Sequence, residues 1–286
     1  MFKLIRYMYS RSKYSFRPPP LQCHRGYWVE GLKENTLDAI QKSYELGYQM
    51  VEFDVRMTAD GEVVLFHDKE RFNKKIAEIK YADLCSHDSV STLKDVLKWY
   101  QTARLYNPLQ THKQKQKINF NPDDSSKYYF YLNIEIKSDN LMDRRLEKKV
   151  LDLINKYDVA DSVLISSFNP LVLAYIRVKS PLILRSLLLT YENENWNNRV
   201  LKSQILNFLS QPHFLHLDER SWNQKKFKPF LDLKIPIVLW TCNDLDSVKT
   251  YFEQGIYGII SDRIQPKDLQ CILDHQSSLF GSNKKS

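Results

Sequence analysis

The residues best suited to catalysis are concentrated in one short stretch, from Gln22 to Asp68. Within it, Glu52 and Asp54 are two positions apart in an apolar segment, so in a β-strand both side chains project from the same face. Two carboxylates on a face that otherwise packs into a core are costly to bury unless a cation or a proton holds them. A hard metal ion is the simplest explanation for this pair.

Short apolar segments, rich in β-branched and aromatic residues, predict three strands in this stretch: Leu21–His24, Met50–Asp54 and Val63–His67. Asp60-Gly61 separates the last two and predicts a hairpin with a two-residue loop. Counting back along both arms from that loop places Asp54 opposite His67. One imidazole is therefore expected beside the carboxylate pair.

A third carboxylate, Glu135, lies in the segment YLNIEIKSD, where it shares one strand face with Asn133 and Lys137. Glu52, Asp54 and Glu135 would together supply three oxygen ligands suited to Mg²⁺ or Ca²⁺, with water and a phosphate oxygen completing the shell. The alternative for Glu135 is a buried ion pair with Lys137 that serves structure alone, although such pairs are poor stabilisers.

His24 and His67 end their predicted strands beside these carboxylates and are the candidate general acid and base. An imidazole suits this work because its unperturbed pKa of about 6.5 lets it give and take protons near neutrality. A lone core histidine is more often structural, but two that end strands beside carboxylates favour catalysis. Arg25 and Lys137 would neutralise the non-bridging oxygens of a bound phosphate.

A set of short motifs carries a resemblance to a known family: His24-Arg25-Gly26, Glu34-Asn35-Thr36, Glu52-x-Asp54, Asp60-Gly61, His67-Asp68 and Glu135-x-Lys137. In order and spacing they resemble the glycerophosphodiester phosphodiesterase family, over about residues 21–270. The resemblance implies metal-assisted hydrolysis of a glycerophosphodiester to sn-glycerol 3-phosphate and an alcohol, in phospholipid and glycerol metabolism. It places the metal on the three carboxylates. It also implies that Phe168 and Trp240 line the glycerol end, where the alternative is ordinary packing at the barrel rim.

Alternatives remain for both the substrate and the roles of single residues. The same motifs fit a related barrel phospholipase that cuts lysophospholipids or phosphatidylglycerol, and a catalytically silent barrel that binds anions. The silent barrel is disfavoured because all five carboxylate and imidazole positions are filled. Direct attack by water and a cyclic phosphate intermediate both suit these residues. Asn35 also fits a helix cap, and Asp68 either orients His67 or caps the turn.

The rest of the chain alternates apolar strands with amphipathic helices, which predicts parallel βα units. Further strands are predicted at Phe130–Ile136, Val163–Ser166, Ile183–Leu189, Phe214–Leu217, Ile237–Trp240 and Gly258–Ser261. Helices are predicted at Leu37–Leu46, Thr92–Gln101, Leu141–Lys156, Pro170–Lys179, Arg199–Leu209 and Leu245–Gln254, with a polar loop at Asn107–Ser126. With the strands that begin at Leu21 and Met50, eight strands close naturally into a TIM-type (β/α)₈ barrel of the α/β class, with the hairpin arm above its mouth.

Composition suggests three parts: a basic and aromatic N-terminal arm over residues 1–20, the barrel over 21–275 and a polar tail over 276–286. The net charge of +8 comes almost entirely from the two ends, so the barrel itself is nearly neutral and no nucleic-acid partner is indicated. The arm predicts weak contact with an anionic membrane surface, a poorly ordered terminus being the alternative. Four cysteines without paired spacing, and no apolar run of about 18 residues, predict a cytoplasmic protein, at most peripheral to the membrane.

Overall fold

The structure, a computed structural model, describes residues 2–10, 16–86, 88–104, 129–138, 143–192 and 204–272. The side chains of residues 2–4 are not among those described. The loop predicted at Asn107–Ser126 and the tail predicted over 276–286 lie outside the described residues.

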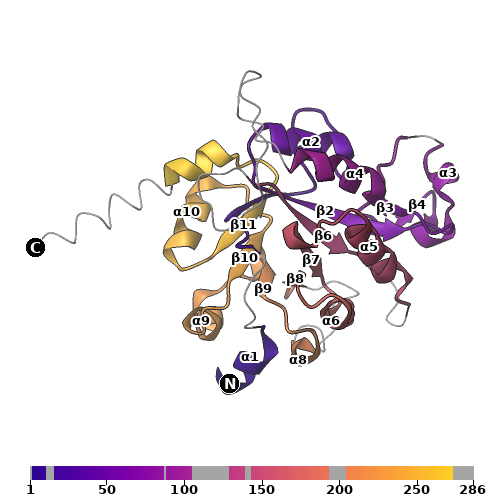
Figure 1. Cartoon of the computed structure of the whole chain (residues 1–286). Helices are drawn as coiled ribbons and strands as arrows, with labels where there is room; N and C mark the ends of the chain where they lie inside the picture. Colours follow the sequence, from indigo (N-terminus) through magenta and orange to yellow (C-terminus); the bar gives the residue numbers. More distant parts are fainter. Residues whose placement is uncertain are drawn as a thin grey trace, which may run out of the picture.

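Eight parallel strands form a closed barrel (Figure 1): β1 (Leu21–Cys23), β2 (Met50–Met57), β6 (Tyr131–Ile136), β7 (Val163–Ser167), β8 (Leu184–Leu189), β9 (Phe214–Asp218), β10 (Ile237–Trp240) and β11 (Gly258–Ser261). β1 pairs with both β11 and β2, and these two pairings close the sheet. The strands are buried almost throughout, as expected where helices cover the outside and side chains fill the inside. The predicted TIM-type barrel is confirmed, and β10 and β11 have the predicted bounds.

Helices cover the outside of the barrel: α2 (Leu37–Glu45), α4 (Leu93–Ala103), α5 (Arg145–Lys156), α6 (Pro170–Lys179), α8 (Asn207–Ser210), α9 (Gln224–Asp232) and α10 (Leu245–Glu253). α6 has the predicted bounds, whereas α9 was not predicted, because Pro229 and four charged residues interrupt its apolar pattern. α8 is shorter than the helix predicted at Arg199–Leu209, since residues 204–206 form a turn and residues 199–203 lie outside the described part.

The loop between β2 and β3 (Val63–Leu65) corrects one sequence-based prediction. β3 pairs antiparallel with β2 outside the barrel, at the carboxyl end of β2, but Met57 pairs with Val63, one residue out of the predicted register. Three residues, not two, separate Thr58 from Glu62, which pair through a 2.9 Å backbone hydrogen bond. Gly61 occupies the left-handed region with φ of +86°, as the last residue of such a three-residue loop commonly does.

The corrected register places Phe66, not His67, opposite Asp54. The backbone N–H of Phe66 donates to the Asp54 carbonyl at 3.1 Å. Because β3 ends at Leu65, the alternation of the strand no longer fixes the direction of the His67 side chain. The position of His67 is therefore set by the chain that follows the strand.

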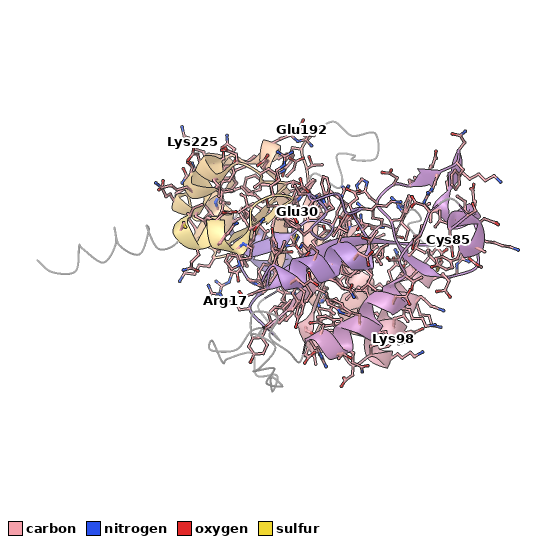
Figure 2. All side chains as sticks on the ribbon, turned by 90° about the horizontal axis from the view of Figure 1, so that it is seen from above. Arg17, Glu30, Cys85, Lys98, Glu192 and Lys225 are labelled. Carbon is pink, nitrogen blue, oxygen red and sulfur yellow. The ribbon has the colours of Figure 1, made fainter. Side chains whose placement is uncertain are left out.

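That following chain forms an excursion at one side of the barrel, made of β4 (Glu70–Arg71), β5 (Lys74–Lys75), η1 (Ile76–Glu78) and α3 (Tyr81–Leu84). It lies at the right of Figure 1, and Cys85, just after α3, lies at the right of Figure 2. A small separate core holds it to β3: Val64, Ile76, Ile79, Leu84 and Val90.

The N-terminal residues pack beneath the barrel. α1 (Phe2–Met8) contacts α8 and α9. Phe16 stacks on Tyr131 with ring centroids 4.1 Å apart, inside the main core. Gly258 permits the chain to pass here, because a Cβ at this position would lie 2.6 Å from the carbonyl oxygen of Pro20.

Within the described ranges, no helix combines the length and apolarity needed to cross a bilayer.

Candidate active site

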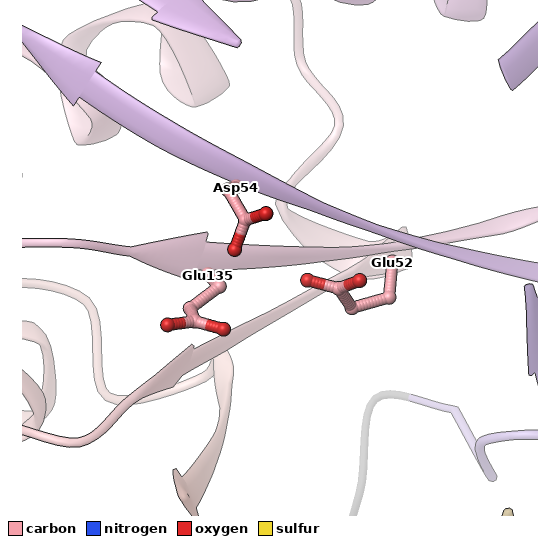
Figure 3. A group of neighbouring side chains, drawn as sticks. All are labelled: Glu52, Asp54 and Glu135. Atoms are coloured by element: carbon pink, nitrogen blue, oxygen red, sulfur yellow. The ribbon is translucent and has the colours of Figure 1, made fainter. Parts of the chain in front are cut away.

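The three predicted ligand carboxylates meet on β2 and β6 at the mouth of the barrel. β2 pairs in parallel with β6, which places Asp54 beside Glu135 and Glu52 beside Asn133. Glu52 and Asp54 are two residues apart and project toward Glu135 (Figure 3). All three carboxylates are buried, and one oxygen from each lies within 4.8 Å of the others.

Two cations partly neutralise this cluster. Lys137 Nζ lies 2.7 Å from Glu135 Oε1 and 3.1 Å from Asp54 Oδ1, and Arg25 Nε lies 3.4 Å from Asp54 Oδ2. Burial raises the pKa of Asp54, but Lys137 and Arg25 outweigh it and hold this pKa below its usual value. Glu52 is less well compensated, so burial and the two neighbouring carboxylates raise its pKa well above its usual value. Because three carboxylates face only two cationic side chains, the cluster favours the binding of a further cation.

Glu52 also indicates where such a charge fits. Its Oε2 accepts from the backbone N–H of Arg25 at 3.1 Å, whereas its buried Oε1 has no hydrogen-bond partner among the described residues. A buried carboxylate oxygen without a donor is costly, and a metal cation would satisfy it. Three close carboxylate oxygens suit Mg²⁺ and Ca²⁺, which prefer oxygen ligands. The residues present therefore fit a hard divalent cation.

The turn after β1 brings Arg25 to the carboxylates. Arg25 and Gly26 both lie in the left-handed region, with φ of +54° and +76°. A Cβ at residue 26 would lie 2.7 Å from the backbone of Ala39, so the close approach of α2 requires glycine. The backbone strain at Arg25 is held by this packing, as is common at functional sites.

Each residue of the Glu34-Asn35-Thr36 motif has its own structural role. Glu34 Oε1 accepts from Arg25 Nη1 at 2.8 Å. Asn35 Nδ2 donates to Asp54 Oδ2, and Asn35 Oδ1 accepts from the Asp54 backbone N–H, both at 2.9 Å. Thr36 is the cap of α2, so the helix-cap alternative for Asn35 is wrong. Asn35 instead orients Asp54.

His24 lies between Glu52 and Asp262. Its Nε2 is 3.9 Å from Glu52 Oε2, and its Nδ1 is 2.7 Å from Asp262 Oδ1. Burial raises the pKa of Asp262, but the hydrogen bond from His24 brings it below its usual value. Asn243 Nδ2 donates to the other Asp262 oxygen at 2.8 Å. An ionised carboxylate only accepts, so Nδ1 carries the proton and Nε2 is the free nitrogen that faces the cluster.

His67 has a similar arrangement at the rim. Its Nδ1 lies 2.9 Å from Asp68 Oδ1, and its backbone carbonyl accepts from Arg56 Nε at 3.0 Å. Burial and the charge of Lys137 lower the pKa of the imidazole, although Asp54 opposes them. His67 thus interacts electrostatically with Lys137 and Asp54 of the cluster, although the predicted register was wrong.

Phe168 and Trp240, after β7 and at the end of β10, pack edge to face with ring centroids 5.6 Å apart. The Trp240 Nε1–H donates to no acceptor within the described part of the chain. The structure thus brings the two predicted pocket aromatics together at the mouth of the barrel.

Other polar residues at strand ends do not join the cluster. Ser166 Oγ donates to Asn133 Oδ1 inside the barrel at 2.8 Å, and Asp218 accepts from Thr190 and Arg220. Conversely, Asp262 contacts a candidate catalytic residue without having been assigned a role. The available sequence signal was its place directly after the predicted strand Gly258–Ser261.

Comparisons with known proteins identify relatives of this chain. The sequence matches the model of the Glycerophosphoryl diester phosphodiesterase family over residues 24–265. It is 25% identical to YqiK, an uncharacterized protein of Bacillus subtilis, over 84% of this chain and 93% of that protein. It is 28% identical to a glycerophosphodiester phosphodiesterase of Caldanaerobacter subterraneus, over 55% of this chain and 61% of that protein.

Solved structures share the fold. A phosphodiesterase from Oleispira antarctica, in complex with the product sn-glycerol-3-phosphate, is similar with a TM-score of 0.67 at 19% identity, over 90% of this chain and 97% of that chain. A glycerophosphodiester phosphodiesterase from Thermotoga maritima is similar with a TM-score of 0.61 at 24% identity, over 90% and 99%.

Proposed function

Because the chain belongs to the glycerophosphoryl diester phosphodiesterase family, we propose that it hydrolyses glycerophosphodiesters to sn-glycerol 3-phosphate and an alcohol. The observation that carries the proposal is the meeting of three buried carboxylates, two imidazoles and two cations at the carboxyl ends of the barrel strands. These groups provide charge neutralisation and proton transfer, the two requirements of phosphodiester hydrolysis.

Glu52, Asp54 and Glu135 are the proposed ligands of one Mg²⁺ or Ca²⁺ ion. When bound, such an ion supplies Lewis-acid polarisation of a phosphate oxygen. Arg25 and Lys137 are proposed to contact the remaining non-bridging oxygens of the substrate, where charge-assisted hydrogen bonds are strongest.

The two imidazoles are proposed to move protons on opposite sides of the phosphate. One removes the proton from the attacking hydroxyl group, and the other donates a proton to the departing alkoxide. In this proposal Asp262 and Asp68 each hold the proton of a histidine Nδ1, so that each Nε2 is free to exchange a proton with the substrate. Asp262 and Asp68 are therefore positioning residues.

The substrate class is proposed from the aromatic pair and the surrounding charge. Phe168 and Trp240 would pack on the glycerol carbons while the charged cluster holds the phosphate. No residue is assigned to the alcohol side of the substrate, so several head groups are expected to be accepted. The sequence of the predicted loop Asn107–Ser126 is too polar to offer a continuous apolar groove for an acyl chain, and this loop lies outside the described residues.

Substrate preference tests this function. The values of kcat/KM for glycerophosphocholine and glycerophosphoethanolamine are expected to be similar and higher than the value for a lysophosphatidylcholine. The product from glycerophosphocholine should be sn-glycerol 3-phosphate with free choline. A clear advantage for the acylated substrate would assign the enzyme to the lysophospholipid-cleaving branch.

Asp262→Asn is expected to lower kcat about 10²-fold with little change in KM, because an amide can donate to Nδ1 and so favours the wrong imidazole tautomer. The pH profile of kcat should change as well, which loss of packing alone would not cause. Asp246→Asn, at an exposed position of α10, is the matched control and should keep the wild-type profile. A wild-type kcat and profile in Asp262→Asn would rule out the positioning role.

The proposed location is the cytoplasm. All four cysteines are free: Cys23, Cys85, Cys242 and Cys271. Free thiols are typical of proteins in a reducing compartment.

A further inference from the structure

A surface at the base of the barrel combines exposed apolar side chains with cations. It is made by α1, α8, the end of α6 and the turn that follows it, which lie at the bottom of Figure 1. α6 contacts α8, and α8 contacts α1. α6 runs from the carboxyl end of β7 to the amino end of β8, and α8 directly precedes the amino end of β9. The end of α6 and α8 therefore lie at the amino ends of the strands, opposite the catalytic mouth.

We call this the base surface, and six apolar side chains define it: Tyr7, Val178, Leu182, Ile205, Phe208 and Leu209. Leu182 is 80% exposed, Val178 76% and Tyr7 72%. The six are the majority of the nine large apolar side chains that are exposed in the described part of the chain. Apolar groups gathered in this way mark an interaction surface.

The base surface is held by specific contacts between its elements. Arg177 Nη1 donates to the Leu209 carbonyl at 2.9 Å and joins α6 to α8. Tyr9, buried just after α1, donates its hydroxyl to Gln204 Oε1 at 2.8 Å. The apolar side chains are therefore presented by a packed framework.

The segments that carry these side chains contain cations and no acids. Residues 2–10, 170–191 and 204–217 contain no Asp or Glu. In the described ranges, Arg6 and Lys179 form no ion pair, and neither does Lys234, after α9. The neighbouring acid Asp232 is already paired with Lys228 at 2.7 Å.

A cavity of about 340 Å³ opens between α1 and the turn after α9. Arg6 and Lys234 line it together with Tyr9 and Ser10. The guanidinium group of Arg6 and the ammonium group of Lys234 on one hollow suit a phosphate-bearing group.

We propose that the base surface docks on an anionic lipid bilayer. Its apolar side chains enter the interface between head groups and acyl chains, its cations contact the lipid phosphates, and the cavity receives one head group. Pairing with a second copy of this chain is disfavoured, because an isologous contact would bring like charges together. Docked in this way, the enzyme turns its mouth to the water, where a deacylated diester would be found.

Co-sedimentation of the full chain with vesicles tests this proposal. We expect binding to vesicles of phosphatidylcholine mixed with phosphatidylglycerol, weak binding to phosphatidylcholine alone, and loss of binding at high salt. The double variants Arg6→Gln/Lys234→Gln and Leu182→Ser/Phe208→Ser should each lower the affinity for the mixed vesicles about tenfold or more.

Matched controls remove similar groups elsewhere: Leu245→Ser, an exposed apolar residue of α10, and Lys98→Gln, an exposed cation of α4. Both should bind as the wild type does. Wild-type binding by the base-surface variants would overturn the proposal. It would also be overturned if the wild-type chain did not bind vesicles and formed, in sedimentation equilibrium, a dimer that Leu182→Ser/Phe208→Ser dissociates. Vesicle binding is measured without substrate, so its outcome is independent of whether the protein hydrolyses glycerophosphodiesters.

Discussion

Glu52→Gln and Glu135→Gln are each expected to lower kcat by about 10³-fold or more, because loss of a metal ligand removes several kcal/mol of charge stabilisation. Glutamine keeps the volume of the side chain and removes its charge. The barrel should therefore stay folded. Calorimetric titration with Mg²⁺ and with Ca²⁺ should show that both variants have lost most of their metal affinity.

The melting temperature without metal separates loss of a ligand from loss of the fold. Glu52→Gln should melt at or above the wild-type temperature, because burial and two neighbouring carboxylates disfavour the ionised form of Glu52. Glu45→Gln, at the exposed end of α2, is the control and should keep both metal affinity and turnover. Unaltered metal affinity in both active-site variants would contradict the ligand assignment.

His24→Gln and His67→Gln are each expected to lower kcat by about 10²-fold or more, the usual effect of losing a positioned proton donor or acceptor. Both variants should keep their metal affinity, which distinguishes them from the carboxylate variants. The double variant should lose less than the product of the two single effects, because the two imidazoles act on one reaction. A single variant with wild-type kcat would identify its histidine as structural.

The barrel could be predicted from the sequence because its strands are short apolar runs bounded by polar residues. β10 and β11 were predicted with their observed bounds, and so was α6, which begins with Pro170 and a cap at Asn169. The hairpin register could not be predicted in this way. The Asp60-Gly61 pair fits loops of two and of three residues. A two-residue type I′ loop requires positive φ at both central residues, whereas here Gly61 has positive φ and Asp60 does not.

The carboxylates of the candidate site could be predicted because the two-residue period of a strand fixes which side chains share a face. The prediction that Glu52 and Asp54 share a face required β2 alone. The parallel pairing of β6 with β2 then places Glu135 beside Asp54. The contacts of Asp262 could not be predicted, because they require closure of the barrel between two segments far apart in the sequence. At that closure the backbone N–H of His24 donates to the carbonyl of Ser261 at 2.9 Å.

The role of Asn35 was missed for a different reason. An Asn side chain can also cap a helix. Because Thr36 caps α2, the Asn35 side chain instead donates to the Asp54 carboxylate. Local sequence did not distinguish the two roles.

We propose that Glu52, Asp54 and Glu135 make hydrolysis of a glycerophosphodiester dependent on a divalent cation. The most direct measurement is release of sn-glycerol 3-phosphate from glycerophosphocholine by enzyme treated with a chelator and then supplied with Mg²⁺ or Ca²⁺. We expect no release after chelation, and recovery with added metal in the wild type but not in Glu52→Gln. A chelated wild-type enzyme that keeps its full rate would contradict the account.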